Sequence, residues 1–373
     1  MSTLSVGRTR WAACVLGAVV WSQGAASTPA APATGIAAPV FAPVTADQPL
    51  VFPRDYGSHP QFRTEWWYVT GWLTTERGES LGFQITFFRT RPGIDENNPS
   101  AFTPRQLLIA HGAVSDPTRG RLWQDQRIRR EGFGLAEANA GDTHVWIDRW
   151  SLERRGAVYS AKVDGEDFSV DLALAQTQSV LLNGDSGVSQ KGPAAQAASY
   201  YYSVPHLRVS GTLVRLGSKD AVTGEAWLDH EWSSEYLDAE AVGWDWIGIN
   251  LDDGAALMAY RIRAADGTPR WAGGTLRDSN GGMQILRPAE VEFHAGRRWT
   301  SPRTRISYPV QWHIRAGRRE FDLEPLLDDQ ENDTRLSTGA IYWEGAVRAN
   351  EQRRFAGRGY LEMTGYGERL RLR

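Results

Sequence analysis

The chain has 373 residues, of which 41% are hydrophobic, 11% are aromatic and 23% are charged, and its formal net charge at pH 7 is −3. A mildly acidic chain argues against a nucleic-acid partner, and its length is enough to bury a sizeable core. Beyond its first 45 residues, the chain is long enough for two domains of typical size.

The first 26 residues have the features of a secretory signal peptide. Arg8 and Arg10 precede an apolar run over residues 11–20, and the small residues after it predict cleavage after Ala25 or Ala26. We therefore expect an exported protein, periplasmic or extracellular, with a retained N-terminal anchor as the alternative. The run is too short to span a bilayer, and no later segment has the roughly 18 apolar residues of a transmembrane helix.

Residues 27–45 are rich in Pro and Ala, carry no charge and predict an extended spacer. The only cysteine, Cys14, lies inside the predicted signal peptide, so we expect no disulfide in the exported protein.

The rest of the chain has the period of β-strands. In SLGFQITFFRTR, Leu81, Phe83, Ile85 and Phe87 fall on one face of a strand. Similar alternation runs through QLLIAHGAVSD, HLRVSGTLVRLG, WIGINLDDGAALMAYRIR and RRFAGRGYLEMTGY, and pairs such as Asn183-Gly184 mark turns. Only DAEAVG and DDQEND have helical spacing. The sequence therefore predicts an all-β protein, mostly antiparallel.

Two hairpins resemble each other. EWWYVTGWLTTERGESLGFQI and GWDWIGINLDDGAALMAYRI each run from a tryptophan cluster through a strand and a polar turn to a glycine. If each hairpin opens a sheet of its own, the chain holds two similar β domains, which we expect at residues 46–238 and 239–373. Closing each sheet into a barrel would remove its exposed edges.

The segment AWLDHEWSSEYLDAEAVGWDWIGI, residues 226–249, sets Asp229, His230, Glu231 and Asp245 beside four tryptophans. Aromatic rings exclude water, so titratable groups among them either pair or shift their pKa values. Such a place is a candidate active site. The alternative is a buried hydrogen-bonded network that holds the junction between the two domains, which is the structural role we expect for Asp229.

The motifs EWWYVTGWL, GFQITFFR, WLDHEWSS, GWDWIGINLDDG and GRGYLEMTGY together resemble the secreted AttH and carotenoid 1,2-hydratase (hydroxyneurosporene synthase) family. The resemblance covers nearly all of residues 50–366, and WLDHEWSS together with GWDW is specific. It implies two lipocalin-like antiparallel β-barrel domains packed together, with a cleft or barrel mouth for an apolar ligand. Members are often described only as secreted hydrolases, and the hydratases are a distinct branch, so the resemblance defines the fold better than the reaction.

Hydration of an isolated alkene requires an acid that protonates one carbon, surroundings that tolerate the carbocation, and one water. A buried carboxyl group with a raised pKa is such an acid, and tryptophan faces stabilise a cation by about 2 kcal/mol where water is excluded. On this hypothesis Asp245 or Glu231 donates the proton. His230 orients the donor or holds the water.

A second group of candidates lies in the N-terminal half. Glu65 precedes a cluster of aromatic residues, and His111 interrupts an apolar strand face, so the two side chains are expected to meet across one barrel interior as an acid and base pair. A histidine satisfied within the core is the alternative for His111. The expected ligand-binding residues are Trp66, Trp67, Trp232, Trp244, Trp246 and Tyr202.

No nucleotide-binding glycine motif or Gly-x-Ser-x-Gly motif occurs in a suitable setting, and no second histidine follows His230 at zinc-binding spacing. We therefore expect no cofactor and no metal. The sequence favours an exported cofactor-free hydratase acting on an unsaturated terpenoid or lipid. The alternatives are a non-catalytic carrier of hydrophobic ligands and a hydrolase that activates water, and the oligomeric state stays open.

Overall fold

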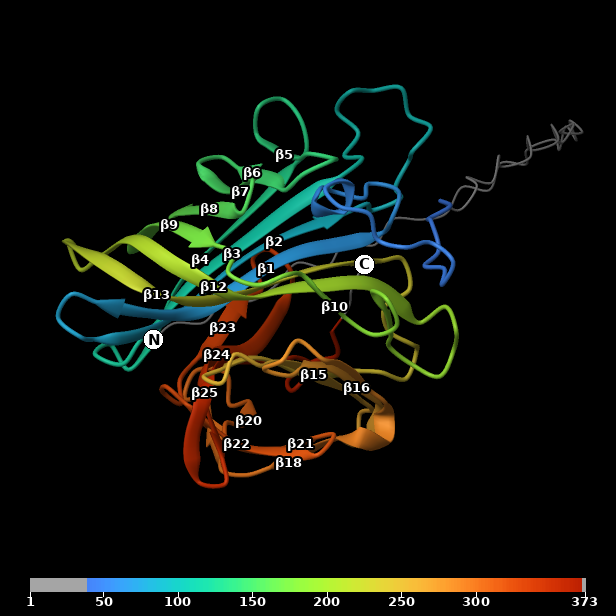
Figure 1. Ribbon diagram of the computed structural model, residues 1–373. Helices are drawn as coiled ribbons and strands as arrows, with labels where there is room; N and C mark the ends of the chain where they lie inside the picture. Colours follow the sequence, from blue (N-terminus) through green and yellow to red (C-terminus); the bar gives the residue numbers. More distant parts are fainter. Residues whose placement is uncertain (1–38, 371–373) are drawn as a thin grey trace, which may run out of the picture. The chain divides into compact units, whose positions relative to one another are not determined.

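The computed structural model describes residues 39–370, and within this range the protein is built from β-strands and two short 3₁₀ turns, with no α-helix. The predicted all-β fold is confirmed. Two large antiparallel sheets stack on each other, one in blue to yellow and one in orange to red in Figure 1. The predicted signal peptide and most of the predicted spacer lie outside the described residues.

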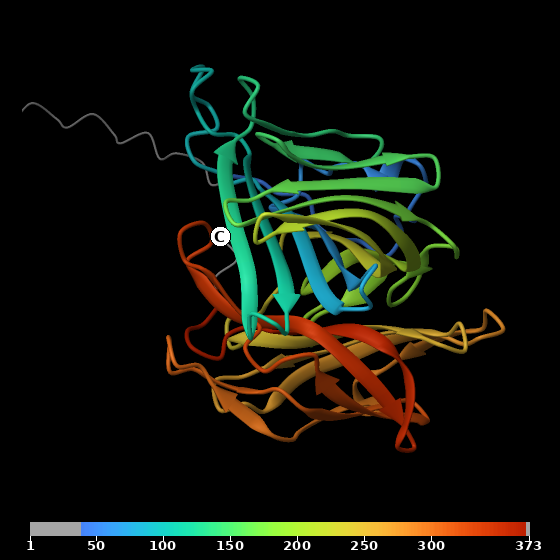
Figure 2. The ribbon, with the colours of Figure 1, turned by 90° about the vertical axis from the view of Figure 1, so that its left-hand side faces the viewer.

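The first sheet has 13 strands in the order β4-β3-β2-β1-β13-β12-β9-β8-β7-β6-β5, and β10 and β11 also pair with β12. Its strands are β1 (Thr64–Thr75), β2 (Ser80–Thr90), β3 (Leu107–Asp116), β4 (Arg121–Arg130), β5 (Ala136–Ala138), β6 (His144–Ile147), β7 (Trp150–Arg155), β8 (Val158–Asp164), β9 (Phe168–Ala175), β10 (Leu181–Leu182), β11 (Val188–Gln190), β12 (Ala198–Arg215) and β13 (Ser218–Ser233). Strands β3 and β4 contact β5 and β6 at the other end of the sheet, so the sheet nearly closes into a barrel (Figure 2).

The second sheet has ten strands in the order β17-β16-β15-β14-β25-β24-β22-β21-β18, with β23 paired to β24. Its strands are β14 (Gly243–Leu251), β15 (Ala256–Arg263), β16 (Pro269–Arg277), β17 (Met283–Leu286), β18 (Val291–Ala295), β21 (Trp312–Ala316), β22 (Arg319–Pro325), β23 (Glu331–Thr334), β24 (Ala340–Glu351) and β25 (Arg354–Met363). A separate ribbon pairs β19 (Arg298–Thr300) with β20 (Ser307–Pro309), and the 3₁₀ turns are η1 (Arg54–Tyr56) and η2 (Pro288–Glu290).

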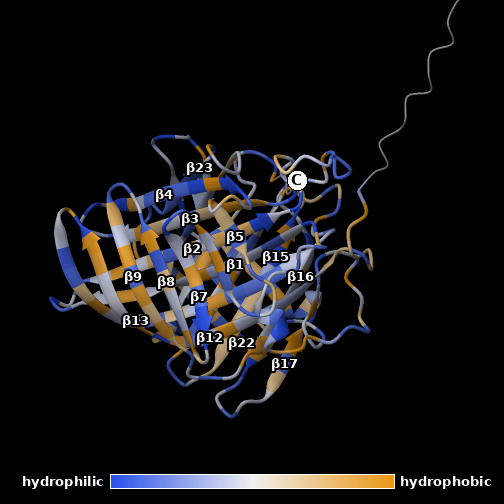
Figure 3. Ribbon diagram, turned by 90° about the horizontal axis from the view of Figure 1, so that it is seen from above, coloured by the Kyte–Doolittle hydropathy of each residue, from blue (hydrophilic) through white to orange (hydrophobic). Residues whose placement is uncertain are grey.

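The hydrophobic residues form three layers. One cluster fills the interior of the first sheet, a second fills the interior of the other sheet, and a third lies between the two sheets. A strand that faces solvent on one side alternates buried and exposed residues, as β9 does, and bands of both colours run along β8 and β9 in Figure 3. Strands β1 and β14 are buried on both faces, because each has one face in a barrel interior and the other at the sheet junction.

The chain passes from the first sheet to the second between Ser233 and Gly243. The expected boundary between residues 238 and 239 falls in this connection, and the division into two domains stays a prediction, since residues 39–370 belong to one compact unit. Neither segment with helical spacing forms a helix. DAEAVG lies mainly in the connection, and part of DDQEND belongs to β23, where backbone pairing with β24 overrides the weak local preference.

Candidate functional site

A cavity lies between the two sheets. Strands β1, β2, β12 and β13 contribute one wall, and β14, β24 and β25 contribute the other. The cavity is narrow, with a volume of about 50 Å³. The cavity is lined by Trp66, Tyr68, Thr86, Phe88, Tyr201, Asp229, Glu231, Tyr236, Trp244, Trp246, Tyr342, Glu344 and Glu362.

The site residues predicted from the sequence lie in two separate places, the cavity and the interior of the first barrel, because side chains alternate between the two faces of a strand. On β13, Asp229 and Glu231 line the cavity, whereas His230 lies on the opposite face, inside the first barrel. Glu65 occupies that same interior face, where it hydrogen-bonds His230. Successive side chains of a strand point to opposite faces, so one sequence motif serves two separate clusters.

Two acidic residues of the second sheet, Glu344 on β24 and Glu362 on β25, sit at opposed positions of neighbouring strands. Burial and then the charge of Glu362 raise the pKa of Glu344 well above its ordinary value. Burial likewise raises the pKa of Glu362 to about 7, although the indole N–H of Trp244 donates to its Oε2 at 2.8 Å. Burial therefore favours the protonated form of Glu344.

Glu344 and Tyr68 lie close together at the cavity. Among residues 39–370, Oε1 of Glu344 and the hydroxyl of Tyr68 are buried atoms that make no well-formed hydrogen bond, although the two side chains are near enough to interact. Buried polar groups are almost always paired in folded proteins, so unpaired atoms facing a cavity are suited to bind a ligand or water.

Asp229 is saturated by hydrogen bonds. Its carboxylate accepts from the indole of Trp227 at 2.6 Å, the hydroxyl of Tyr201 at 2.7 Å and the hydroxyl of Ser203 at 2.5 Å. Burial raises the pKa of Asp229 to about 7, and these three donors oppose the shift. The Tyr201 hydroxyl also accepts from the indole of Trp246 at 2.9 Å. Asp229 thus joins the side chains of the cavity wall in one hydrogen-bonded network, and its structural role stays a prediction.

The six predicted ligand-binding residues separate in the same way. Trp66, Trp244 and Trp246 line the cavity, whereas Trp67, Trp232 and Tyr202 belong to the core of the first barrel. Four of the lining residues are partly exposed, namely Phe88, Tyr236, Trp244 and Glu362. These residues therefore mark the mouth of the cavity.

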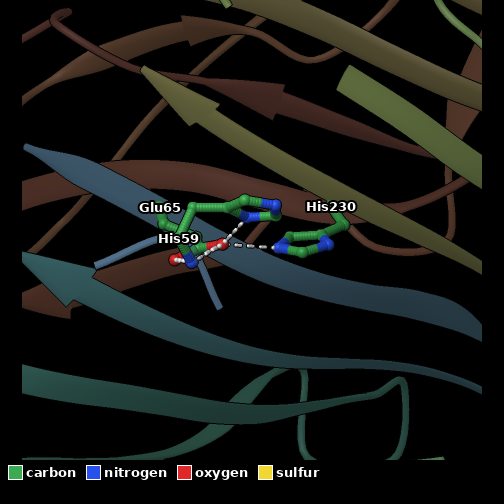
Figure 4. A group of neighbouring side chains, drawn as sticks. All are labelled: His59, Glu65 and His230. Carbon is green, nitrogen blue, oxygen red and sulfur yellow. Dashed lines mark hydrogen bonds and ion pairs between the residues drawn. The ribbon is translucent and has the colours of Figure 1, made fainter. Parts of the chain in front are cut away.

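Inside the first barrel, Glu65 joins two histidines, as Figure 4 shows. Its Oε1 is 2.7 Å from Nδ1 of His59 and 2.9 Å from Nε2 of His230, and its Oε2 accepts from Nε of Arg89 at 2.7 Å. Burial opposes ionisation, but the charge of Arg89 and these hydrogen bonds hold the pKa of Glu65 well below its ordinary value. Burial lowers the pKa of His230 to about 4, so its imidazole is neutral.

His59, Glu65 and His230 bring their ligand atoms within 4.8 Å of one another, which is a donor set that zinc accepts. The hydrogen bonds nevertheless satisfy these atoms. Glu65 Oε1 accepts from both imidazoles, and Nδ1 of His230 is 3.0 Å from the hydroxyl of Tyr202. The rings are packed by stacking of His59 on Trp232 and of Trp67 on His230. The cluster is accounted for as a buried ionic network that pins the barrel interior.

Glu65 and His111 do not meet as expected. Glu65 pairs with Arg89 in the barrel, whereas His111 on β3 shares the opposite face with Thr86 and bonds to the second sheet. Its Nδ1 is 2.7 Å from the Tyr342 hydroxyl, and burial lowers its pKa to about 3. The strand register places Glu65 and His111 on opposite faces of the sheet, because cross-strand partners share a face.

Asp245 also lies away from the cavity. Its carboxylate pairs with Arg261 at 2.6 Å and Arg263 at 3.0 Å, and it accepts from the hydroxyl of Tyr366 at 2.9 Å. The flanking residues Trp244 and Trp246 point to the other face and line the cavity. With two guanidinium groups on one carboxylate, Asp245 forms a buried ionic cluster in the second sheet.

Comparison with known proteins agrees with this architecture. Residues 43–366 match the model of the AttH family, described as AttH-like. The chain belongs to the AttH-like family. A search of curated proteins found no match.

Solved structures show how widely the AttH-like fold is shared. A crystal structure of an AttH protein from Nitrosomonas europaea is 52% identical in sequence and has a TM-score of 0.83, covering 88% of this chain and 100% of that one. Kievitone hydratase from Nectria haematococca is 16% identical, with a TM-score of 0.65 over 88% and 96% of the two chains. CghA, solved with Sch210972, is 12% identical, with a TM-score of 0.51 over 82% and 89%. The last two likenesses concern the fold alone.

Sequence reasoning missed the acidic residues that the second sheet contributes to this AttH-like cavity. Glu344 follows Trp343 in AIYWEGAVR, and Glu362 interrupts the apolar run of GRGYLEM. An acidic residue within an apolar stretch was the sequence signal that could have identified them. Their mutual approach depends on the pairing of β24 with β25, which the local pattern does not reveal.

Within residues 39–370, no helix is both long and apolar enough to cross a membrane.

Proposed function

We propose that this AttH-like protein is a cofactor-free hydratase, a carbon–oxygen lyase, that adds water to a carbon–carbon double bond of an unsaturated terpenoid or lipid, or removes water in the reverse direction. The observation that carries this proposal is the buried carboxyl pair Glu344 and Glu362 in a cavity walled by tryptophan and tyrosine. The membership of a hydratase among proteins with this fold is consistent with it.

Glu344 is the proposed proton donor. Burial raises its pKa and favours the protonated form, and its Oε1 makes no well-formed hydrogen bond, so a substrate can compete for the carboxyl group with the neighbouring Tyr68 hydroxyl. Protonation of one alkene carbon leaves a carbocation on the other, and the faces of Trp66 and Trp246 stabilise such a cation by about 2 kcal/mol where water is excluded. One water then adds to the cation.

The narrowness of the cavity favours a substrate that inserts one alkene-bearing end, such as a terminal isopropylidene group, rather than a whole long molecule. The partly exposed rings of Phe88, Tyr236 and Trp244 are the proposed contacts for the rest of an apolar substrate.

Export by the N-terminal signal peptide belongs to the same proposal, and N-terminal sequencing of the mature protein from cell fractions would test it.

Incubation in H₂¹⁸O with geraniol, farnesol and squalene tests the reaction, with mass spectrometry of the products. A hydratase yields an alcohol that carries ¹⁸O, and Glu344→Gln removes this activity while the exposed Glu137→Gln control retains it. Label found only in the acid released from an ester probe such as p-nitrophenyl butyrate would instead identify a hydrolase. Bound lipid that is never converted, seen by native mass spectrometry, would identify a carrier. Full hydration by Glu344→Gln would refute its role.

A further inference from the structure

Lys191 is a buried lysine in a chain that strongly prefers arginine. The sequence has only three lysines, and the side chain of Lys191 is 1% exposed. By contrast, the side chain of Lys162 is 54% exposed, and Lys219 is also exposed. An ammonium group in a dry site loses its hydration and is retained only where other groups compensate it.

The compensation comes from one carboxylate and a cage of tyrosine rings. Nζ of Lys191 lies 2.8 Å from Oε1 of Glu231. It also lies 4.7 Å from the ring centre of Tyr201, 5.2 Å from that of Tyr236 and 4.2 Å from that of Tyr260. Such cation–π contacts hold the ammonium group in one place.

Glu231 is held by several groups at once. Besides Lys191, the hydroxyl of Ser199 donates to Oε1, and the Tyr236 hydroxyl lies 3.3 Å from Oε2. The titratable groups that act on Glu231 from the surrounding elements are Lys191, Tyr201, Tyr236, Tyr260, Asp229 and Glu362.

Of the four carboxyl groups that line the cavity, Glu231 alone has a cationic partner among the described residues. The other three have raised pKa values, for which burial is the main cause. The cavity therefore combines carboxyl groups whose pKa is raised by burial with one, Glu231, that has a cationic side chain 2.8 Å away. Acid–base catalysis needs a proton donor and a proton acceptor in one site.

We propose that Glu231 is the catalytic base of this cavity and that Lys191 is the positioning residue that keeps it ionised. This inference rests on the proposed hydration. Glu344 gives its proton to one alkene carbon, and the electron pair of the double bond forms the new C–H bond. The water oxygen bonds to the cationic carbon, and its surplus proton passes to Glu231. Glu231 returns that proton through water to the Glu344 carboxylate, so both groups regain their starting states.

Lys191→Met, Glu231→Gln and the double variant test the proposal, with Lys162→Met as the matched control for loss of a lysine that pairs with an acid, Asp171, at the surface. The assay is ¹⁸O incorporation into the isoprenoid that the parent hydrates, followed against pH, together with urea denaturation. Lys191→Met should lower kcat roughly a hundredfold with a smaller change in KM. The acid limb of its pH profile should move to higher pH, because the positive charge beside Glu231 is removed.

The double variant keeps the test valid where a single variant folds poorly, because it leaves no unpaired buried charge. It should resist urea better than either single variant and still be inactive, while Lys162→Met keeps the activity of the parent. A stable double variant with parental turnover would show that the pair is structural and overturn this inference alone. A parent protein that hydrates no probe would overturn the proposed function and this inference with it.

Discussion

His111 should make the protein less stable in acid. Its imidazole is 1% exposed between the two sheets, and burial lowers its pKa from 6.5 to about 3. Because the folded state has the lower pKa, the unfolded state binds more protons between these values, so the free energy of unfolding falls as the pH falls through that window. A pKa difference of this size corresponds to roughly 5 kcal/mol in full, of which about 2 kcal/mol is lost between about pH 7 and pH 5.

His111→Asn isolates this contribution. Asparagine retains an acceptor for the hydroxyl of Tyr342, which lies 2.7 Å from Nδ1 of His111, and it does not titrate. Urea denaturation of parent and variant near pH 7 and pH 5 measures the difference, which should change by about 2 kcal/mol in favour of the variant at the lower pH. His294→Asn, at an exposed side chain, controls for loss of an imidazole. Parallel stability curves for parent and His111→Asn would refute the reasoning.

Three substitutions test other parts of the structure. Glu65→Gln leaves buried Arg89 without its counter-ion and should lower the free energy of unfolding by about 3–5 kcal/mol in urea denaturation, so a loss below about 1 kcal/mol would contradict the ionic network. Asp245→Asn should be similarly destabilised yet keep hydrating any substrate that the parent hydrates, and selective loss of turnover in a stable variant would return Asp245 to the active site. Gly248→Ala places a Cβ 2.6 Å from the ring of Trp246, so the free energy of unfolding should fall by about 1–3 kcal/mol. The displaced ring should also weaken binding of an apolar fluorescent probe. Probe affinity equal to that of the parent would show that the position of the ring is unimportant.

The alternation of apolar residues was enough to predict an all-β fold, because strand side chains repeat every two residues whatever their tertiary partners. The paired hairpins beginning at Glu65 and Gly243 also correspond to β1–β2 and β14–β15, each of which opens one of the two sheets. The family could also be identified from the sequence, because its motifs are short stretches of consecutive residues. Glu231, Trp244 and Trp246 were expected in one cluster and Trp66 in a second group, and all four line the cavity, although their roles stay predictions.

By itself, the sequence determined which residues alternate along each strand and that charges stand among tryptophans. Only the tertiary structure decided which face of each strand meets the other sheet. That choice sends His230 and Glu65 into the first barrel, leaves Asp229 and Glu231 in the cavity, and pairs Asp245 with arginines of the second sheet. It also brings Glu344 into the cavity from the second sheet and Lys191 against Glu231, which lines the wall formed by the first sheet. A local pattern specifies two faces but not their partners, since partners are set by register and packing between segments far apart in the chain.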